Sequence, residues 1–153
     1  MELTKPAFLI IPLLQGFEWF DEGLQRSLCA RGWPVLTRPE SMVMIHVLLG
    51  LTRPPEIARS LGLTRQAIYR TLGQICAKGL FELQPDPEDR RGSIIQLTDI
   101  GNAMRHDAQH IVTLMHRELQ HRLGEKLLAQ LAESMAADWG PAPAFGPNDR
   151  RLR

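Results

Sequence analysis

Residues 51–101 constrain the fold of this chain more than any other stretch. They read LTRPPEIARSLGLTRQAIYRTLGQICAKGLFELQPDPEDRRGSIIQLTDIG. Pro54 and Pro55 suit the first turn of a helix over residues 52–61, because proline there leaves no helical hydrogen bond unmade. Gly62 suits the left-handed residue that ends this helix, and Thr64 is a good N-cap for a second one. The stretch is therefore predicted to begin with two short helices joined by a tight turn.

Helical periodicity divides the second helix into two faces. Ile68, Leu72 and Ile75 recur at spacings of four and three, so they share the face that packs on the rest of the domain. A solvated amphipathic helix and a helix that enters a major groove would both carry polar side chains on the other face. The candidates for contact with phosphates and base edges are Thr64, Arg65, Gln66, Tyr69, Arg70 and Gln74.

Two short runs rich in β-forming residues follow the second helix, at 81–83 and 94–97. Pro85, Pro87 and Gly92 mark the turn between them. Two helices followed by such a hairpin form a winged helix-turn-helix, which reads duplex DNA with its second helix. The hairpin, or wing, therefore favours the DNA-binding interpretation of that helix.

The turn of the wing concentrates charge. Arg90 and Arg91 lie at its tip, where they could reach a narrow minor groove or its flanking phosphates. Asp89 is predicted to pair with a nearby arginine and so hold the loop in shape. Residues 51–91 contain seven basic and five acidic residues, and the second helix has none of the acids, which predicts a modest basic stripe. The basic residues are Arg53, Arg59, Arg65, Arg70, Lys78, Arg90 and Arg91.

The wing and the segment after it resemble the signature of a known family. MarR-family transcription regulators carry a DPxDRR…LTxxG pattern, which two segments of this chain resemble: Asp86-Pro87-Glu88-Asp89-Arg90-Arg91 and Leu97-Thr98-Asp99-Ile100-Gly101. Lys78-Gly79-Leu80 is similar to that family's link from recognition helix to wing. The chain departs from the family at Glu82-Leu83-Gln84, where a basic residue is usual. The resemblance is specific over residues 51–101 and extends in layout over residues 8–138.

This resemblance implies a homodimeric repressor that binds a palindromic operator in double-stranded DNA. It also implies release of the operator by a small anionic or phenolic ligand. The residues that fall where the family reads the major groove are Arg65, Gln66, Tyr69 and Arg70. The residues that fall where its wing meets the minor groove are Arg90 and Arg91.

Helical patterns on both sides of the DNA-binding unit, residues 37–100, predict one mainly α domain over 1–153 with a small β-hairpin wing. Residues 7–31 and 101–139 are predicted to be dimerisation helices, because they have more apolar face than one subunit can cover. Thr37 and Glu40 form a capping-box pattern that begins a nearly apolar, central helix. Residues 140–153 contain three prolines and are predicted to be a flexible tail.

Bulk composition excludes other classes of protein. The chain has 153 residues, 44% of them apolar, and a net charge of +1, so it is neither disordered nor a membrane protein. Two cysteines, Cys29 and Cys76, make no disulfide framework and are expected to be small packed residues in a reducing cytoplasm. The apolar run at 7–14 lacks the cleavage site of a signal peptide and is expected to enter the first helix.

A ligand pocket is predicted between the dimerisation helices and the DNA-binding unit. Aromatic rings with a few polar groups suit a flat organic acid, although core packing would explain the same side chains without a ligand. The candidate residues are Phe17, Phe20, Trp33, Met42 and His46.

Alternatives to a ligand-released DNA reader are weaker. His106 and His110 share a helix face but do not fill a tetrahedral site, so no metal or other cofactor is expected. Peroxide sensors in one branch of the family that the chain resembles carry the thiol early in the first helix with tyrosines nearby. Cys29 lies late in its helix with no tyrosine near it in sequence, so the resemblance disfavours a peroxide sensor. A winged helix used only for protein contacts would not need arginines on both the second helix and the wing. No nucleophile–base arrangement, glycine-rich phosphate loop or carboxylate pair indicates an enzyme.

Overall fold

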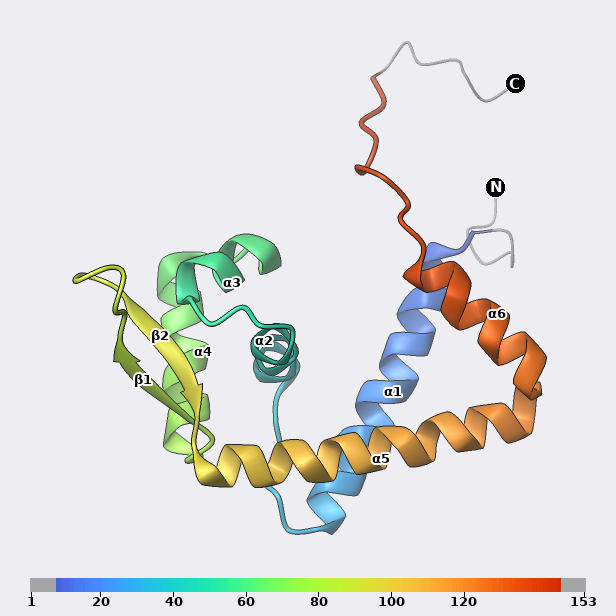
Figure 1. Ribbon diagram of the computed structural model, residues 1–153, viewed down its shortest axis with the longest axis horizontal. Helices are drawn as coiled ribbons and strands as arrows, with labels where there is room; N and C mark the ends of the chain where they lie inside the picture. Colours follow the sequence, from blue (N-terminus) through green and yellow to red (C-terminus); the bar gives the residue numbers. More distant parts are fainter. Residues whose placement is uncertain (1–7, 147–153) are drawn as a thin grey trace. The chain divides into compact units, whose positions relative to one another are not determined.

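The computed structural model describes residues 8–146, which form six helices and one two-stranded antiparallel sheet (Figure 1). This confirms the predicted mainly α fold with a small hairpin. One compact unit ends at Met115 and a second begins at His116. Residue 7 of the predicted first helix and residues 147–153 of the predicted tail lie outside the described residues. The elements are α1 (Ile10–Ala30), α2 (Arg38–Leu48), α3 (Pro54–Leu61), α4 (Arg65–Ala77), β1 (Phe81–Pro85), β2 (Ser93–Leu97), α5 (Asp99–Leu123) and α6 (Glu125–Ala136).

Local signals place the ends of α2 and α3 where the sequence predicts them. The Glu40 carboxylate accepts a hydrogen bond from the Thr37 amide at 2.6 Å, as expected of a capping box at the start of α2. Pro54 and Pro55 occupy the first turn of α3. Gly62 ends α3 in the left-handed conformation, at φ 64°, which a residue with a side chain rarely adopts.

The core of the first unit lies between α2, α3, α4 and the hairpin. Ile68, Leu72 and Ile75 of α4 are fully buried, as the periodicity predicts, and pack in one cluster with Val43 and Ile57. Each of these side chains contributes about 1.5–3 kcal/mol through removal of its apolar surface from water. The cluster fixes the rotation of α4 and therefore decides which of its faces meets solvent.

α2, predicted to be nearly apolar and central, is only partly buried. Val43 and Val47 are buried, whereas Ile45 and Leu48 remain 37% and 44% exposed. These two side chains line a hollow beside α1 and α5 instead of packing in the core. Periodicity could not reveal this, because a helix with apolar residues on most sides has no distinct buried face in its sequence.

α5 begins in direct contact with the turn between α4 and β1. Thr98 Oγ1 donates to the Gly79 carbonyl oxygen at 2.5 Å and accepts from the Gly101 amide at 2.9 Å. A Cβ at Gly101 would lie 2.1 Å from the Leu80 carbonyl oxygen, so glycine alone permits this approach. The LTxxG segment therefore joins the winged unit to α5 through backbone contact.

Large apolar side chains also stay exposed on α1, α5 and α6. Leu13 and Leu14 of α1 are 38% and 51% exposed, Leu114 of α5 is 43% exposed, and Leu127 and Leu131 of α6 are 54% and 46% exposed. No helix within residues 8–146 combines the length and apolar character needed to span a membrane. Exposed apolar faces of this kind favour contact with another protein surface.

Candidate nucleic-acid interface

α4 presents one polar face to solvent because its other face is fixed in the core. Its first turn is capped by Thr64, whose Oγ1 accepts a hydrogen bond from the Ala67 amide at 3.1 Å. The Arg65 guanidinium lies over the half-buried Tyr69 ring, 5.8 Å from its centroid. No acidic residue interrupts this face within α4. Its exposed side chains are those of Thr64, Arg65, Gln66, Arg70 and Gln74.

The wing is a regular hairpin beside α4 (Figure 1). β1 pairs with β2 along its full length, with Phe81 opposite Leu97 at one end and Pro85 opposite Ser93 at the other. The turn between the strands leaves both predicted wing arginines exposed. The structure therefore places the polar face of α4 and the wing tip on two neighbouring elements of the same unit.

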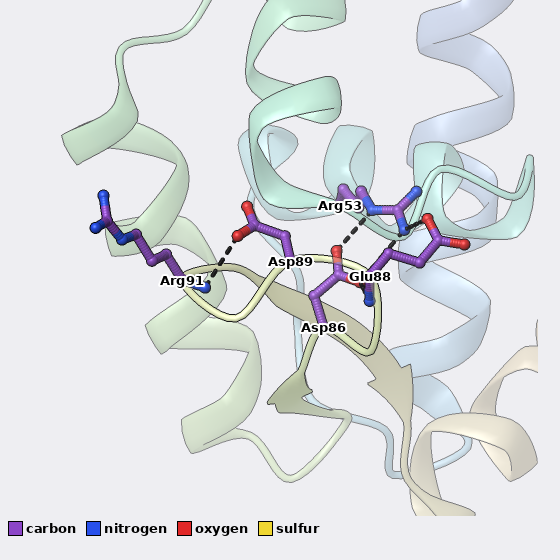
Figure 2. Close-up of polar contacts among 5 residues, drawn as sticks. All are labelled: Arg53, Asp86, Glu88, Asp89 and Arg91. Carbon is purple, nitrogen blue, oxygen red and sulfur yellow. Dashed lines mark hydrogen bonds and ion pairs between the residues drawn. The ribbon is translucent and has the colours of Figure 1, made fainter.

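An arginine at the start of α3 holds the base of the wing turn. Arg53 Nε donates to Asp86 Oδ2 at 2.7 Å, and Arg53 Nη2 also bonds Glu88 (Figure 2). The Asp86 side chain is only 2% exposed, and the Arg53 guanidinium holds the pKa of this carboxyl below its ordinary value. The Ile95 amide of β2 donates to the Thr52 carbonyl oxygen at 2.8 Å. The wing is thus joined to α3 by side chains and by backbone.

Asp89 does not form the predicted ion pair with any arginine of residues 8–146. Its Oδ1 accepts a hydrogen bond from the Arg91 amide at 2.9 Å (Figure 2). Its carbonyl oxygen accepts a hydrogen bond from the Gly92 amide at 2.9 Å. The ion pair belongs to Asp86, because Asp86 lies at the base of the turn facing Arg53 while Asp89 is exposed near the tip. Asp89 shapes the wing through backbone amides.

A groove of about 580 Å³ is lined by α3, the start of α4 and the wing. Arg59 of α3, Arg65 of α4 and Arg91 of the wing line it, together with the paired Arg53 and Asp86. In Figure 2 the Arg91 guanidinium extends away from the Arg53 cluster. The groove is continuous with the polar face of α4, because Arg65 belongs to both.

Known proteins share this arrangement. Residues 36–92, which include the whole of α2, α3, α4 and β1, match the family model described as the MarR family. The apo form of wild-type MarR from E. coli is 25% identical, with 88% of this chain and 96% of that chain covered and a TM-score of 0.66. The match to the family model includes the Asp86–Arg91 segment of the wing.

Two further solved structures share the MarR fold. CouR, described as a transcriptional repressor and bound to a 23-mer DNA duplex, is 23% identical over 89% of this chain and 96% of its own, with a TM-score of 0.63. PcaV, a transcriptional regulator from Streptomyces coelicolor in complex with its natural ligand, is 20% identical over 88% and 92%, with a TM-score of 0.59. At these identities the likeness shows the fold alone.

α4 ends at an ion pair between the partly buried Lys78 and the buried Glu40. Lys78 Nζ lies 2.6 Å from each carboxylate oxygen of Glu40 and 2.9 Å from the Val35 carbonyl oxygen. Burial acts to raise the pKa of Glu40, but hydrogen bonds from Lys78 and Thr37 outweigh it and hold that pKa below its ordinary value. Lys78 is therefore neutralised within the protein and does not extend the basic stripe, contrary to the prediction.

The five predicted ligand residues do not surround one cavity. Phe17 and Phe20 line a hollow of about 570 Å³ beside α2 and α5. Trp33 Nε1 instead donates to Asp107 Oδ2 at 2.7 Å. The His46 ring bonds the Met42 carbonyl oxygen at 2.7 Å and, on its other side, Ser60 Oγ of α3 at 2.9 Å. Helix periodicity could not separate these environments, because they depend on which helices lie beside each residue.

The hollow also contains a residue that the sequence reasoning missed. Arg105 lines it together with Asp21 and with apolar side chains that include Leu24 and Val112. Its Nε is buried and has no hydrogen-bond partner within residues 8–146. The sequence contains one signal for it. Arg105 lies between Met104 and Ala108, which are both on the apolar stripe of α5, and a charged residue next to such a stripe can be partly buried. A buried donor without a partner is costly, which makes this hollow suited to an acceptor.

The histidines and cysteines that were considered as metal ligands or redox sensors do not form a common site within residues 8–146. No group of three or more histidine, cysteine, aspartate or glutamate side chains in residues 8–146 is arranged to hold a metal ion. Cys29 is exposed, so the prediction that it is packed is wrong. Cys76 is half-buried, and burial raises the pKa of its thiol, which disfavours the reactive thiolate.

Proposed function

We propose that this chain is a sequence-specific DNA-binding regulator that binds a palindromic operator as a homodimer and acts as a repressor. The observation that carries the proposal is the acid-free polar face of α4, which the core turns toward solvent beside two exposed wing arginines. α4 enters the major groove, and Arg90 and Arg91 reach the adjacent minor groove or its phosphates. CouR, which has the same fold, is a repressor bound to duplex DNA.

The exposed apolar faces of α1, α5 and α6 support the dimer. A second copy related by a two-fold axis would cover them with the same faces. Two recognition helices in such a dimer bind half-sites about 34 Å apart, which is one turn of the double helix. Selection from a random duplex pool at two salt concentrations tests this proposal. Recovery of one salt-sensitive palindrome supports it, whereas recovery of no sequence favours a winged helix that binds protein.

Replacing Arg70 by alanine is expected to weaken operator binding by about 1–3 kcal/mol, because a bidentate contact to a base edge is lost. The loss should be concentrated at one base pair of each half-site, measured by titrating operators that carry single substitutions. Arg26→Ala is the matched control, since Arg26 is exposed on α1 and pairs with Glu22. Operator binding by Arg70→Ala equal to that of the control contradicts the assignment of Arg70 to base contact.

We assign the effector site to the hollow lined by Phe17, Phe20 and Arg105, and its ligand class to small aromatic acids. The aromatic rings supply apolar contact, and the unpaired Arg105 Nε supplies a donor for a carboxylate. The hollow lies between α1, α2 and α5, so a ligand there would contact both a predicted dimerisation helix and the DNA-binding unit. Such a ligand releases DNA if it binds one arrangement of these helices more tightly than another.

Benzoate is the probe for this site. Binding should raise the free energy of unfolding of the wild type, by about 2.7 kcal/mol at a concentration one hundred times its Kd. Arg105→Gln should lose this stabilisation, and Arg117→Gln, an exposed arginine on the same helix, should retain it. Thermal unfolding with and without benzoate measures this stabilisation. Equal stabilisation of the two variants would count against Arg105 as the carboxylate partner.

A further inference from the structure

The groove described above has arginines on both of its sides. Arg59 comes from α3 and Arg91 from the wing, and Arg65 lies at the first residue of α4. The apolar part of the lining includes Ala58, Leu63 and Ile68. Ala58 and Ile68 are buried residues of the hydrophobic core, so the core forms the floor of the groove. The groove therefore has an apolar floor with basic side chains around it, and it is open to solvent.

Its charge is positive once the internal pairs are taken into account. The charge of Arg53 is offset by Asp86, to which it donates from two nitrogens. Among residues 8–146, Arg59, Arg65 and Arg91 form no ion pair with an acid. Asp89 is the remaining carboxylate of the lining, and its Oδ1 is occupied by the Arg91 amide. Three guanidinium groups are thus free to bind an anion that enters the groove.

Duplex geometry specifies which anion this is. A single phosphodiester strand separates a major groove from the next minor groove. When α4 lies in the major groove and the wing tip reaches the minor groove, that strand must cross the protein surface between α4 and the wing. This surface is the groove. We infer that the groove holds the DNA strand between the two recognition elements, and that Arg59 binds one of its phosphates.

This inference rests on the proposed function and adds Arg59 to the residues that contact DNA. α3 supports α4 in the core through Ile57 and Ala58, so the sequence assigns it a structural role only. Arg59 comes directly after Ala58 in the sequence, is exposed and lines the groove. Its contact is with the backbone, so it contributes to affinity at every sequence and not to the choice of base.

The test is the salt dependence of operator binding by Arg59→Ala. Each neutralised phosphate contributes about 0.9 to the slope of log K against log salt concentration. With one contact per subunit, the dimeric variant should have a slope smaller by about 2 and should bind about tenfold or more weakly at low salt. Operator and unrelated duplex should be weakened by similar factors. Arg59→Lys, which keeps the charge, should retain most of the slope.

Arg26→Ala is the control for loss of one exposed arginine elsewhere. Ethylation of single operator phosphates gives a second readout. One phosphate at the boundary between the α4 half-site and the flanking minor groove should matter for the wild type and not for Arg59→Ala. If the wild type binds its operator and Arg59→Ala has the affinity and salt slope of the control, the inference about Arg59 is wrong and the proposed function stands. If the wild type binds no duplex, it fails together with the proposed function.

Discussion

Replacing Gly101 by alanine is expected to lower the free energy of unfolding by about 2–3 kcal/mol. The added Cβ would lie 2.1 Å from the Leu80 carbonyl oxygen and 3.1 Å from Leu97 Cδ2. Overpacking of this kind typically costs about 1–3 kcal/mol or more, because backbone cannot move aside as a flexible side chain can. The better helix propensity of alanine offsets only about 1 kcal/mol of this cost. Urea unfolding at a fixed protein concentration measures the difference.

Gly73→Ala is the matched control for this prediction. Gly73 also lies inside a helix, but a Cβ there meets nothing within 4 Å. Alanine at this position should therefore raise the free energy of unfolding by about 0.5–1 kcal/mol through helix propensity alone. The prediction has opposite signs for two identical substitutions. Stabilisation by both variants would show that α5 can move away from the Leu80 backbone at little cost.

The elements that sequence reasoning placed correctly are those with local signals. Thr37 and Thr64 cap helices through bonds within three residues, and Gly62 turns the chain through its own φ. The buried face of α4 follows from the 3.6-residue period within one helix. Such signals need no knowledge of distant residues, so one sequence was enough for the fold class and for the order of its elements.

Pairings between distant residues could not be predicted in the same way. Arg53 and Asp86 are 33 residues apart, and Lys78 and Glu40 are 38 apart. The sequence contains several acids near the wing, and nothing local indicates that Asp86 is the one that faces α3. Both pairs remove a cation from the predicted basic stripe, which leaves Arg59, Arg65, Arg70, Arg90 and Arg91 as its members.

The predicted ligand residues show the same limit. Phe17 and Phe20 are three positions apart on α1, a spacing that puts them on one helix face, and both line the same hollow. His46 and Trp33 were grouped with them by their chemistry, but their partners Ser60 and Asp107 lie on α3 and α5. The sequence does not predict the role of Arg105, because the burial of its Nε depends on how α1, α2 and α5 pack together.

Replacing Lys78 by methionine is expected to lower the free energy of unfolding at pH 7 by about 3 kcal/mol. The Glu40 side chain is 1% exposed, so the variant would keep a buried carboxylate whose remaining bond is to the Thr37 amide. Removal of one partner from a buried ion pair typically costs about 3–5 kcal/mol, and the capping bond places this case at the lower end. Methionine preserves most of the volume of lysine, so packing changes little.

The pH dependence of this loss distinguishes it from a packing effect. In the wild type the pKa of Glu40 is lowered, so the pair stabilises the fold above the unfolded-state pKa and this stability is lost as pH falls through the folded-state value. In Lys78→Met, only Thr37 still opposes the effect of burial, so the pKa of Glu40 rises relative to the wild type and protonation relieves the variant as pH falls from 7 toward 4. The difference between the two proteins should therefore shrink over that interval.

Glu40→Gln combined with Lys78→Met should recover most of the loss at pH 7, because a neutral amide still accepts from Thr37 without a buried charge. A double variant as unstable as Lys78→Met at every pH would show that lysine stabilises the end of α4 by packing alone.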